Sequence, residues 1–260
     1  MTPFFYTRLS SFYFFYYFFV GLFVPYWGIY LKSLSFNALQ IGALLSLFQI
    51  SRIFAPNVLG WVADQSGEYI KWIKVSSFFG FIIFMGIFWS NTFINIFIVM
   101  MAMSIFTSST LPLAESLTLS HLKANKADSK YSHIRLWGSI GFIVAALLLG
   151  VMIDSYGERS LIYALLITQF VIFLLAFVLP PKKVIFTKNI KRSIWPILKQ
   201  REVIVLLLSC ALMVSSHGLL YNFYSIFLEE QGYSGASIGL LWSVGVVFEI
   251  LIFLLMPKIL

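Results

Sequence analysis

Long apolar runs separated by short polar segments dominate the chain. A transmembrane helix needs about 20 mostly apolar residues, and eight runs reach that length: residues 10–31, 39–63, 72–90, 93–118, 134–153, 160–179, 203–228 and 236–256. The runs are continuous, whereas the strands of a membrane barrel alternate polar and apolar residues. The pattern therefore predicts an all-α membrane protein with eight transmembrane helices.

The composition agrees with this assignment. Hydrophobic residues make up 60% of the chain and charged residues 11%, against about 25% charged in soluble domains. The aromatic stretch at 12–19 follows a single basic residue and no small-residue cleavage site follows it. A signal peptide would show both a charged start and such a site, so we expect a retained first helix.

Positive charge is concentrated on one side of the predicted topology. The net charge is +8. With the N-terminus in the cytoplasm, the inner segments hold 15 of the 18 basic residues: Arg8, Lys71, Lys74, Lys123, Lys126, Lys130, Arg135, Lys182, Lys183, Lys188, Lys191, Arg192, Lys199, Arg201 and Lys258. This is the positive-inside rule, and it requires no nucleic acid as partner. It predicts an inner-membrane protein whose N-terminus is cytoplasmic and whose basic loops attract anionic lipid.

The longest polar stretch, at about 180–202, divides the chain. It opens with Pro180-Pro181, which stop a helix, and it carries seven basic residues. An ordinary basic loop would also explain it. We expect a six-helix half at 1–180, a cytoplasmic linker at 181–202, and the first two helices of a second half at 203–260.

The second half begins to repeat the first. A shift of 197 residues pairs Ile29 with Ile226 and Gly42 with Gly239, and six of the 24 pairs from Ile29 to Arg52 are identical. Both copies are predicted helical hairpins of the same orientation. Duplicated halves with a site between them are typical of secondary transporters.

Three ionisable residues lie deep within the predicted spans. Charges in a bilayer cost a few kcal/mol each and usually face a cavity or a partner. Arg52 is near the middle of the second span, Glu249 is about 20 Å along the eighth, and His217 is at similar depth in the seventh. We expect them to form one polar site at the midplane, or else structural contacts between helices. An imidazole there could relay protons.

Glu115 and Arg135 form a second group of ionisable residues in the predicted spans. Glu115 ends the fourth span and Arg135 begins the fifth, so antiparallel packing would place them at similar depth. Arg135 alone could be a snorkelling residue at a helix end. We expect the pair to bind substrate or to couple conformational change. Aromatic residues that could line the path are Phe142, Tyr26, Trp27, Tyr221 and Tyr224, although any of them could equally serve in packing.

Motifs for metal or nucleotide chemistry are absent from the sequence. It has no CxxC, HExxH or Walker-type loop, and the lone Cys210 excludes an intrachain disulfide. We expect no cofactor and no enzymatic activity.

The segment from Gly60 to Gly67 resembles the GxxxDxxG core of the signature loop of the major facilitator superfamily. By this resemblance Gly60, Asp64 and Gly67 belong to a gating loop. The family's basic residues are displaced here, to Lys71 and Lys74.

The stretch from Pro112 to Glu115, together with residues 135–142, is similar to the fourth and fifth helices of the lactose permease branch. That resemblance implies that Glu115 and Arg135 bind substrate. Phe142 stands where the permease has a sugar-stacking tryptophan, which argues against galactosides. Glu249 resembles the eighth-helix glutamate of the same branch.

Segments from the first helix to the eighth resemble the 3-phenylpropionate transporter family: residues 24–32, 51–52, 135–139, 216–218 and 241–247. The resemblance implies a major facilitator fold of twelve helices, of which eight are present before Leu260, so we expect a C-terminally incomplete chain. It also implies a monomer that takes up a small organic solute, such as an aromatic acid, together with a proton.

Other functions remain open from the sequence. A truncated chain could insert without transporting, or act as a membrane sensor. The solute could be a sugar or a nucleoside instead of an aromatic acid. A membrane enzyme would need a concentrated His, Asp or Glu motif in a loop, and no loop offers one.

Overall fold

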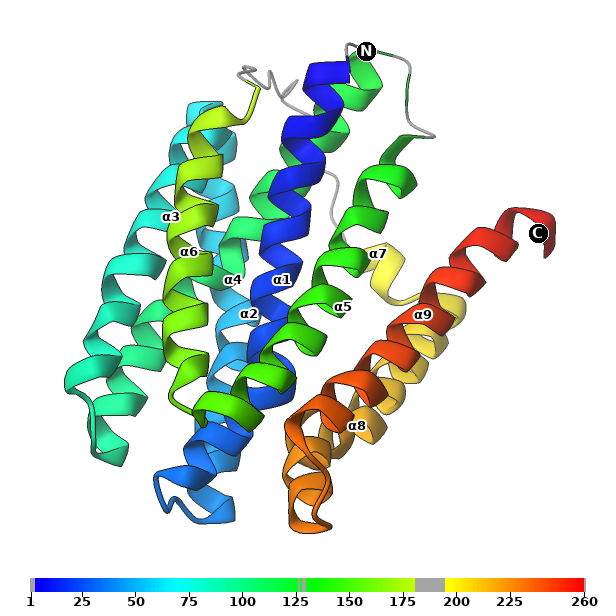
Figure 1. Ribbon diagram of the computed structural model, residues 1–260. Helices are drawn as coiled ribbons and strands as arrows, with labels where there is room; N and C mark the ends of the chain where they lie inside the picture. The colour runs from blue at the N-terminus through cyan, green and yellow to red at the C-terminus, as the bar shows by residue number, and fades with distance from the viewer. Residues whose placement is uncertain (1–2, 126, 128–129, 181–194, 260) are drawn as a thin grey trace.

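The computed structural model describes residues 3–125, 127, 130–180 and 195–259, and within these ranges the side chains from residue 5 to residue 252. The regular secondary structure of these described residues is helical (Figure 1). In chain order they are α1 (Pro3–Ser33), α2 (Ala38–Ser66), α3 (Tyr69–Met85) with the 3₁₀ turn η1 (Gly86–Trp89), α4 (Phe93–Ala124), α5 (Tyr131–Tyr156), α6 (Ser160–Val178), the short α7 (Trp195–Leu198), α8 (Arg201–Glu230) and α9 (Gly235–Ile259).

Eight of the described helices are long and apolar enough to cross a membrane, with α3 and η1 forming one span. The eight predicted apolar runs each correspond to one of them, so the all-α membrane fold is confirmed. The helices extend past the apolar runs, and α4 continues to Ala124 where 93–118 was expected. Hydropathy marks only the segment in hydrocarbon, while backbone hydrogen bonding carries a helix into the polar interface.

The ends of α2 show how local sequence sets a helix boundary. The Asn37 side chain accepts a hydrogen bond from the Gln40 N–H, and the Gln40 side chain accepts one from the Asn37 N–H. Such a reciprocal capping box satisfies backbone donors that the first turn leaves free. At the other end Gly67 has φ 69°, a left-handed conformation that suits glycine, and its N–H bonds to the Ala63 carbonyl.

Helix α1 lies at the centre of a bundle formed by α1–α6. Its aromatic face is buried, with Phe12 and Tyr13 fully covered. The backbones of α1 and α5 approach each other closely. A Cβ atom at Gly141 would collide with the Phe14 carbonyl, and one at Gly21 would collide with the Phe142 carbonyl. Small residues permit such close packing of membrane helices.

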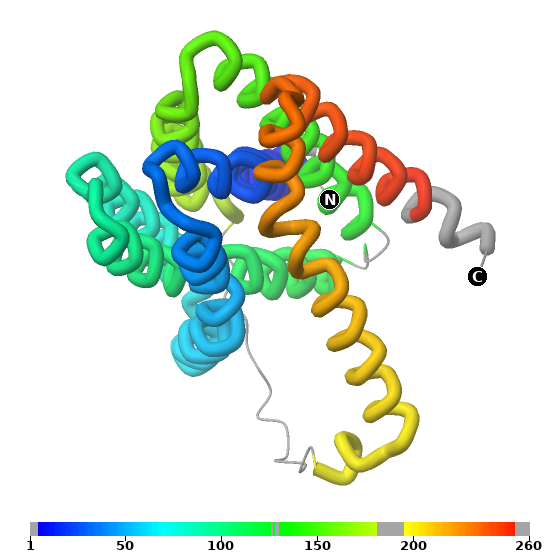
Figure 2. Tube along the Cα trace, turned by 90° about the horizontal axis from the view of Figure 1, so that it is seen from below, coloured from blue at the N-terminus to red at the C-terminus, as the bar shows by residue number. Residues whose placement is uncertain are grey.

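Helices α8 and α9 form a hairpin that packs against this bundle at one end, the joined end, and along α5 as far as Phe142. The joined end holds the α1–α2, α5–α6 and α8–α9 connections, at the bottom of Figure 1. From the joined end α8 and α9 diverge, as Figure 2 shows from below. The first part of α8, residues 201–217, has no buried side chain. Contact between the two parts is therefore concentrated near one membrane face.

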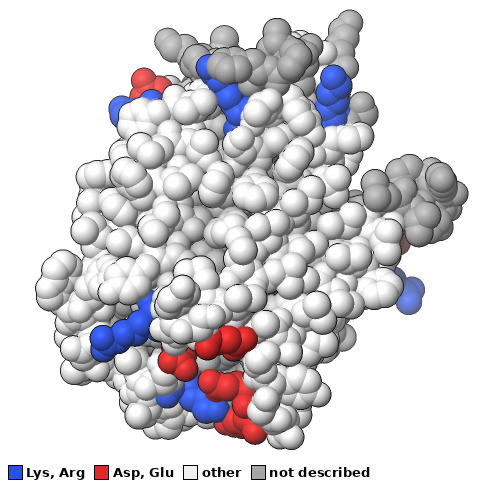
Figure 3. Space-filling view, viewed as in Figure 1, with Lys and Arg blue, Asp and Glu red and all other residues white. Residues whose placement is uncertain are grey.

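On the face shown in Figure 3, charged side chains occur mainly toward the two ends of the molecule, and the band between them is almost free of them. This distribution suits helices that span a bilayer. Most of the predicted linker, residues 181–194, lies outside the described residues, so the proposed division at 181–202 stays a prediction.

Candidate functional site

Glu115 lies in the C-terminal part of α4. Its side chain is half-buried. The Tyr131 hydroxyl, at the start of α5, donates a long hydrogen bond of 3.4 Å to Glu115 Oε1. The carboxyl group is thus held between two helices that a loop connects.

Arg135 is placed by α1. Its guanidinium carbon lies 3.9 Å from the centre of the Tyr17 ring, a cation–π contact. Gly138, one turn further along α5, makes room for this arrangement, because a Cβ there would lie 2.5 Å from Tyr17 Cδ2 and 3.1 Å from a terminal nitrogen of Arg135. A side chain at 138 would displace the ring, the guanidinium, or both.

Glu115 and Arg135 attract each other electrostatically. Among the described residues, however, no ion pair of 4 Å or less joins them. Each charge instead contacts a tyrosine, Tyr131 for Glu115 and Tyr17 for Arg135. The two charged groups are therefore near enough to interact electrostatically, although they do not form an ion pair.

Tyrosines of α1 complete this site, and sequence reasoning missed them. Tyr13 and Tyr16 are buried, and Tyr16 interacts electrostatically with both Arg52 and Glu115. The Tyr16 hydroxyl donates to the Thr107 carbonyl at 3.4 Å. The signal was the spacing of Tyr13, Tyr16 and Tyr17, which puts three hydroxyls on one side of a helix. It was hidden in a chain that is 18% aromatic.

Arg52, Glu249 and His217 are not brought together in the described part of the chain. All three are exposed, and no contact joins any two of them. His217 contacts its own helix, through Met213 O at 2.8 Å and the Tyr221 ring. His217 and Glu249 lie on the two helices of the hairpin, which diverge from the joined end, and this agrees with their separation (Figure 2). Only Arg52 is linked to the Glu115 site, through Tyr16.

Phe142 takes part in an aromatic cluster that includes two predicted lining residues. Its ring centre is 6.3 Å from that of Trp242 in α9, and Tyr221 and Tyr224 in α8 are each 5.9 Å from Trp242. The Trp242 Nε1–H donates to Ser225 Oγ at 2.8 Å. Tyr26 and Trp27 are instead fully buried in helix packing. The cluster joins both parts of the molecule midway along α5.

The predicted gating loop is an ordinary helix end in this structure. Gly60 is inside α2 with open space around it, and Gly67 ends the helix. Asp64 is exposed and accepts a hydrogen bond from the Tyr69 hydroxyl of α3. A gating role for these residues stays a prediction.

The joined end is held by polar contacts. Asp154 of α5 accepts hydrogen bonds from the Gly235 and Ala236 N–H groups at 2.6 and 2.9 Å, so a carboxylate of one part caps a helix of the other. The Tyr26 hydroxyl of α1 also lies within hydrogen-bond distance of the Gly235 carbonyl of α9, at 3.1 Å. Lys32 pairs with Glu229 at 3.0 Å. Lys32 and Glu229 are 197 residues apart, the period of the repeat, so equivalent positions of the two copies meet here.

Where side chains are described, no three His, Cys, Asp or Glu residues lie close enough to hold a metal ion. The site is a tyrosine-lined carboxylate and guanidinium within a helical membrane protein. Such an arrangement can bind a polar or charged solute and can exchange a proton.

Fold and site together define a multi-pass membrane protein of the major facilitator type. The sequence model described as "MFS_1 like family" matches residues 6–260, and the chain belongs to this family. The family resemblance seen in the sequence is thereby confirmed.

Two curated relatives are similar over most of this chain. The "Probable 3-phenylpropionic acid transporter" of Escherichia coli (strain K12) is 29% identical over 255 residues, which cover 95% of this chain and 65% of the relative. The "Uncharacterized transporter YwbF" of Bacillus subtilis (strain 168) is 24% identical, covering 94% of this chain and 61% of that protein. The chain thus spans about two thirds of the length of these relatives.

The crystal structure of the nucleoside transporter NupG has the same fold. Its TM-score is 0.82 at 20% identity, over 99% of this chain and 68% of that one. At this identity the likeness concerns the fold alone.

Proposed function

We propose that the chain takes part in secondary active transport of a small organic anion across the inner membrane, by alternating access and with a proton. The observation that carries this proposal is the pair Glu115 and Arg135. Both are half-buried in apolar helices and are held by separate tyrosines, with no ion pair of 4 Å or less between them. Keeping such charges in a membrane protein is costly, which is why they usually mark a transport site.

Arg135 is the anion-binding group of this proposal. Its guanidinium lies over the Tyr17 ring, and no salt bridge between Arg135 and a carboxylate is seen among the described residues. A planar guanidinium can bind a carboxylate through two parallel hydrogen bonds. The similarity to a 3-phenylpropionic acid transporter supports an aromatic acid as solute. The aromatic cluster around Trp242 begins two turns further along α5, about 10 Å from Arg135, and could contact the ring of such a solute.

Glu115 is the proposed proton-coupling group. A carboxyl group close to a binding arginine is stabilised in its charged form by the guanidinium. When a solute carboxylate binds Arg135, the guanidinium interacts with two carboxylates. The charged form of Glu115 is then stabilised less, and Glu115 takes up a proton more easily. Solute and proton would then enter the site together.

Alternating access would use the joined end. If the N-terminus is cytoplasmic, the joined end lies outside and the diverging ends of α8 and α9 lie inside. Its contacts, Asp154 with the α9 N-terminus and Lys32 with Glu229, would then hold the site closed to the outside. Opening would separate α5 from α9.

The test is uptake of radiolabelled 3-phenylpropionate into proteoliposomes with an imposed proton gradient. We expect Glu115→Gln to abolish proton-driven accumulation and Arg135→Lys to weaken solute binding strongly. Glu202→Gln and Arg201→Lys are matched controls, because both residues are exposed in the first turn of α8. Unchanged uptake in both site variants would refute the assigned roles. Uptake of nucleosides or maltose, but not of the acid, would point to another solute.

A further inference from the structure

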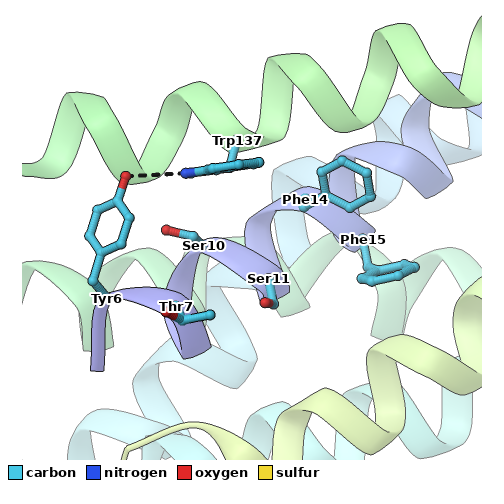
Figure 4. A pocket seen from close by; sticks show the side chains of 7 residues that line it. All are labelled: Tyr6, Thr7, Ser10, Ser11, Phe14, Phe15 and Trp137. Atoms are coloured by element: carbon cyan, nitrogen blue, oxygen red, sulfur yellow. Dashed lines mark hydrogen bonds between the residues drawn. The ribbon is translucent and has the colours of Figure 1, made fainter. Parts of the chain in front are cut away.

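A groove of about 310 Å³ lies between α1 and α5, close to the N-terminal end of α1, and neither Glu115 nor Arg135 lines it (Figure 4). It is open on one side. Four aromatic side chains form most of its wall, Tyr6, Phe14, Phe15 and Trp137, and Ser10 and Ser11 add hydroxyl groups.

The groove faces away from the bundle. On α1, Leu9, Phe12, Tyr13 and Tyr16 are buried and mark the side that packs inward. At 100° per residue, positions 7, 11, 14 and 15 lie on the opposite side. On that side Thr7 is exposed and Ser11, Phe14 and Phe15 are half-buried, so the groove opens at the surface of the described structure, within a helix long enough to span a membrane.

One buried polar atom points into the groove. Ser10 is 5% exposed, and its hydroxyl has no hydrogen-bond partner among the described residues. In Figure 4 this hydroxyl is directed toward the space between Tyr6 and Trp137. A buried hydroxyl without a partner is unfavourable, so a ligand that accepts a hydrogen bond at this position would be stabilised.

The position of the groove along α1 matches the headgroup and the first part of the acyl chains of a lipid. Trp137 Nε1–H donates to the Tyr6 hydroxyl at 3.1 Å, and that hydroxyl donates to the His133 carbonyl at 3.2 Å. Trp and Tyr with polar tips typically sit at the membrane interface. From Tyr6 to Phe15 the helix advances about 13 Å, which leads from the interface into hydrocarbon.

We propose that this groove binds a single anionic phospholipid. The Ser10 hydroxyl donates to an ester carbonyl of the lipid, and one acyl chain lies along Phe14 and Phe15. The negative charge is favoured because the end of the bundle that holds the start of α1 and the end of α4 carries basic side chains, among them Arg8 and Lys123. Figure 3 shows Lys and Arg side chains in its upper part, one group of them beside acidic side chains. The proposal is independent of which solute is transported.

The probe is phosphatidylglycerol with a diazirine in one acyl chain, in vesicles of phosphatidylethanolamine and phosphatidylglycerol that contain the full chain. After irradiation, mass spectrometry maps the labelled peptides. We expect labelling concentrated on residues 6–15 of α1 and around Trp137. Ser10→Trp fills the groove and should lower this labelling at least about tenfold. Ser10→Ala should lower it about fivefold, the effect of one neutral hydrogen bond.

Ser215→Trp is the matched control, since Ser215 is an exposed hydroxyl residue on α8, far along the chain. It should leave labelling of α1 unchanged, and circular dichroism should show equal helix content in all variants. Labelling spread evenly over the apolar surface would overturn the proposal, as would labelling that survives Ser10→Trp. Competition by 3-phenylpropionate would also overturn it, by assigning the groove to solute.

Discussion

Two groups of membrane charges look alike in the sequence and differ in the structure. Glu115 and Arg135 are half-buried, held by Tyr131 and Tyr17, and close to each other. Arg52, Glu249 and His217 lie at comparable depth in their spans but are exposed and do not meet. The difference teaches that depth in a span is not enough for a site. Neighbouring helices must also bring their polar faces together, and α4 and α5 do so around α1.

The strongest test of this contrast is the removal of one arginine from each group. We expect Arg135→Ala to lower 3-phenylpropionate uptake about a hundredfold, since two charge-assisted hydrogen bonds to the carboxylate are lost. Arg52→Ala should change uptake less than about threefold, because Arg52 reaches the site only through Tyr16. Initial rates over a range of solute concentrations measure both. Equal losses would remove the distinction between the groups.

A smaller effect is expected from crowding the ring that supports Arg135. Gly138→Ala places a methyl group 2.5 Å from Tyr17 Cδ2, so the ring must move and the guanidinium with it. Uptake should fall about tenfold, mainly through a higher KM. Gly245→Ala is the control, because no atom lies within 4 Å of its Cβ position. A fall in kcat with unchanged KM would contradict a positioning role.

The joined end offers a third comparison, between two acidic residues. Asp154 caps α9 and so connects the two parts, whereas Glu158 makes no such contact in the described structure. Asp154→Asn weakens two hydrogen bonds to the α9 N-terminus. We expect outside labelling of a cysteine at Ser139, in a Cys210→Ser background, to rise about fivefold with an impermeant thiol reagent. Glu158→Gln, in the neighbouring turn, should not change it. Equal labelling of both variants would show that Asp154 does not hold this end closed.

The smallest effects should come from the remaining members of the exposed group. His217→Gln and Glu249→Gln should each change uptake less than about twofold, and they should leave its pH profile in place. His217 bonds only to its own helix in the described structure. A shifted pH profile in either variant, with Glu115→Gln still coupled, would move proton coupling to the second group.

The residues around Glu115 show how much of the candidate site can be predicted from the sequence. Its apolar surroundings and its distance from Arg135 in antiparallel helices were enough to predict a shared site. The tyrosines that hold the pair could not be selected, because Tyr13, Tyr16 and Tyr17 stand in a run of eight aromatic residues. Which of these rings face the bundle depends on how α1 is rotated against α4 and α5, and rotation is a property of packing.

The sequence by itself determined the eight spans, the repeat and the family, because apolar length and residue identity are recorded along the chain. Only the tertiary structure decided that Glu115 and Arg135 share a site while Arg52, Glu249 and His217 stay apart. It also decided that Lys32 meets Glu229, and that Asp154 caps α9 across the junction of the two parts. These contacts join residues from 80 to 200 positions apart, and their formation depends on the rotation and divergence of whole helices, which local patterns do not specify.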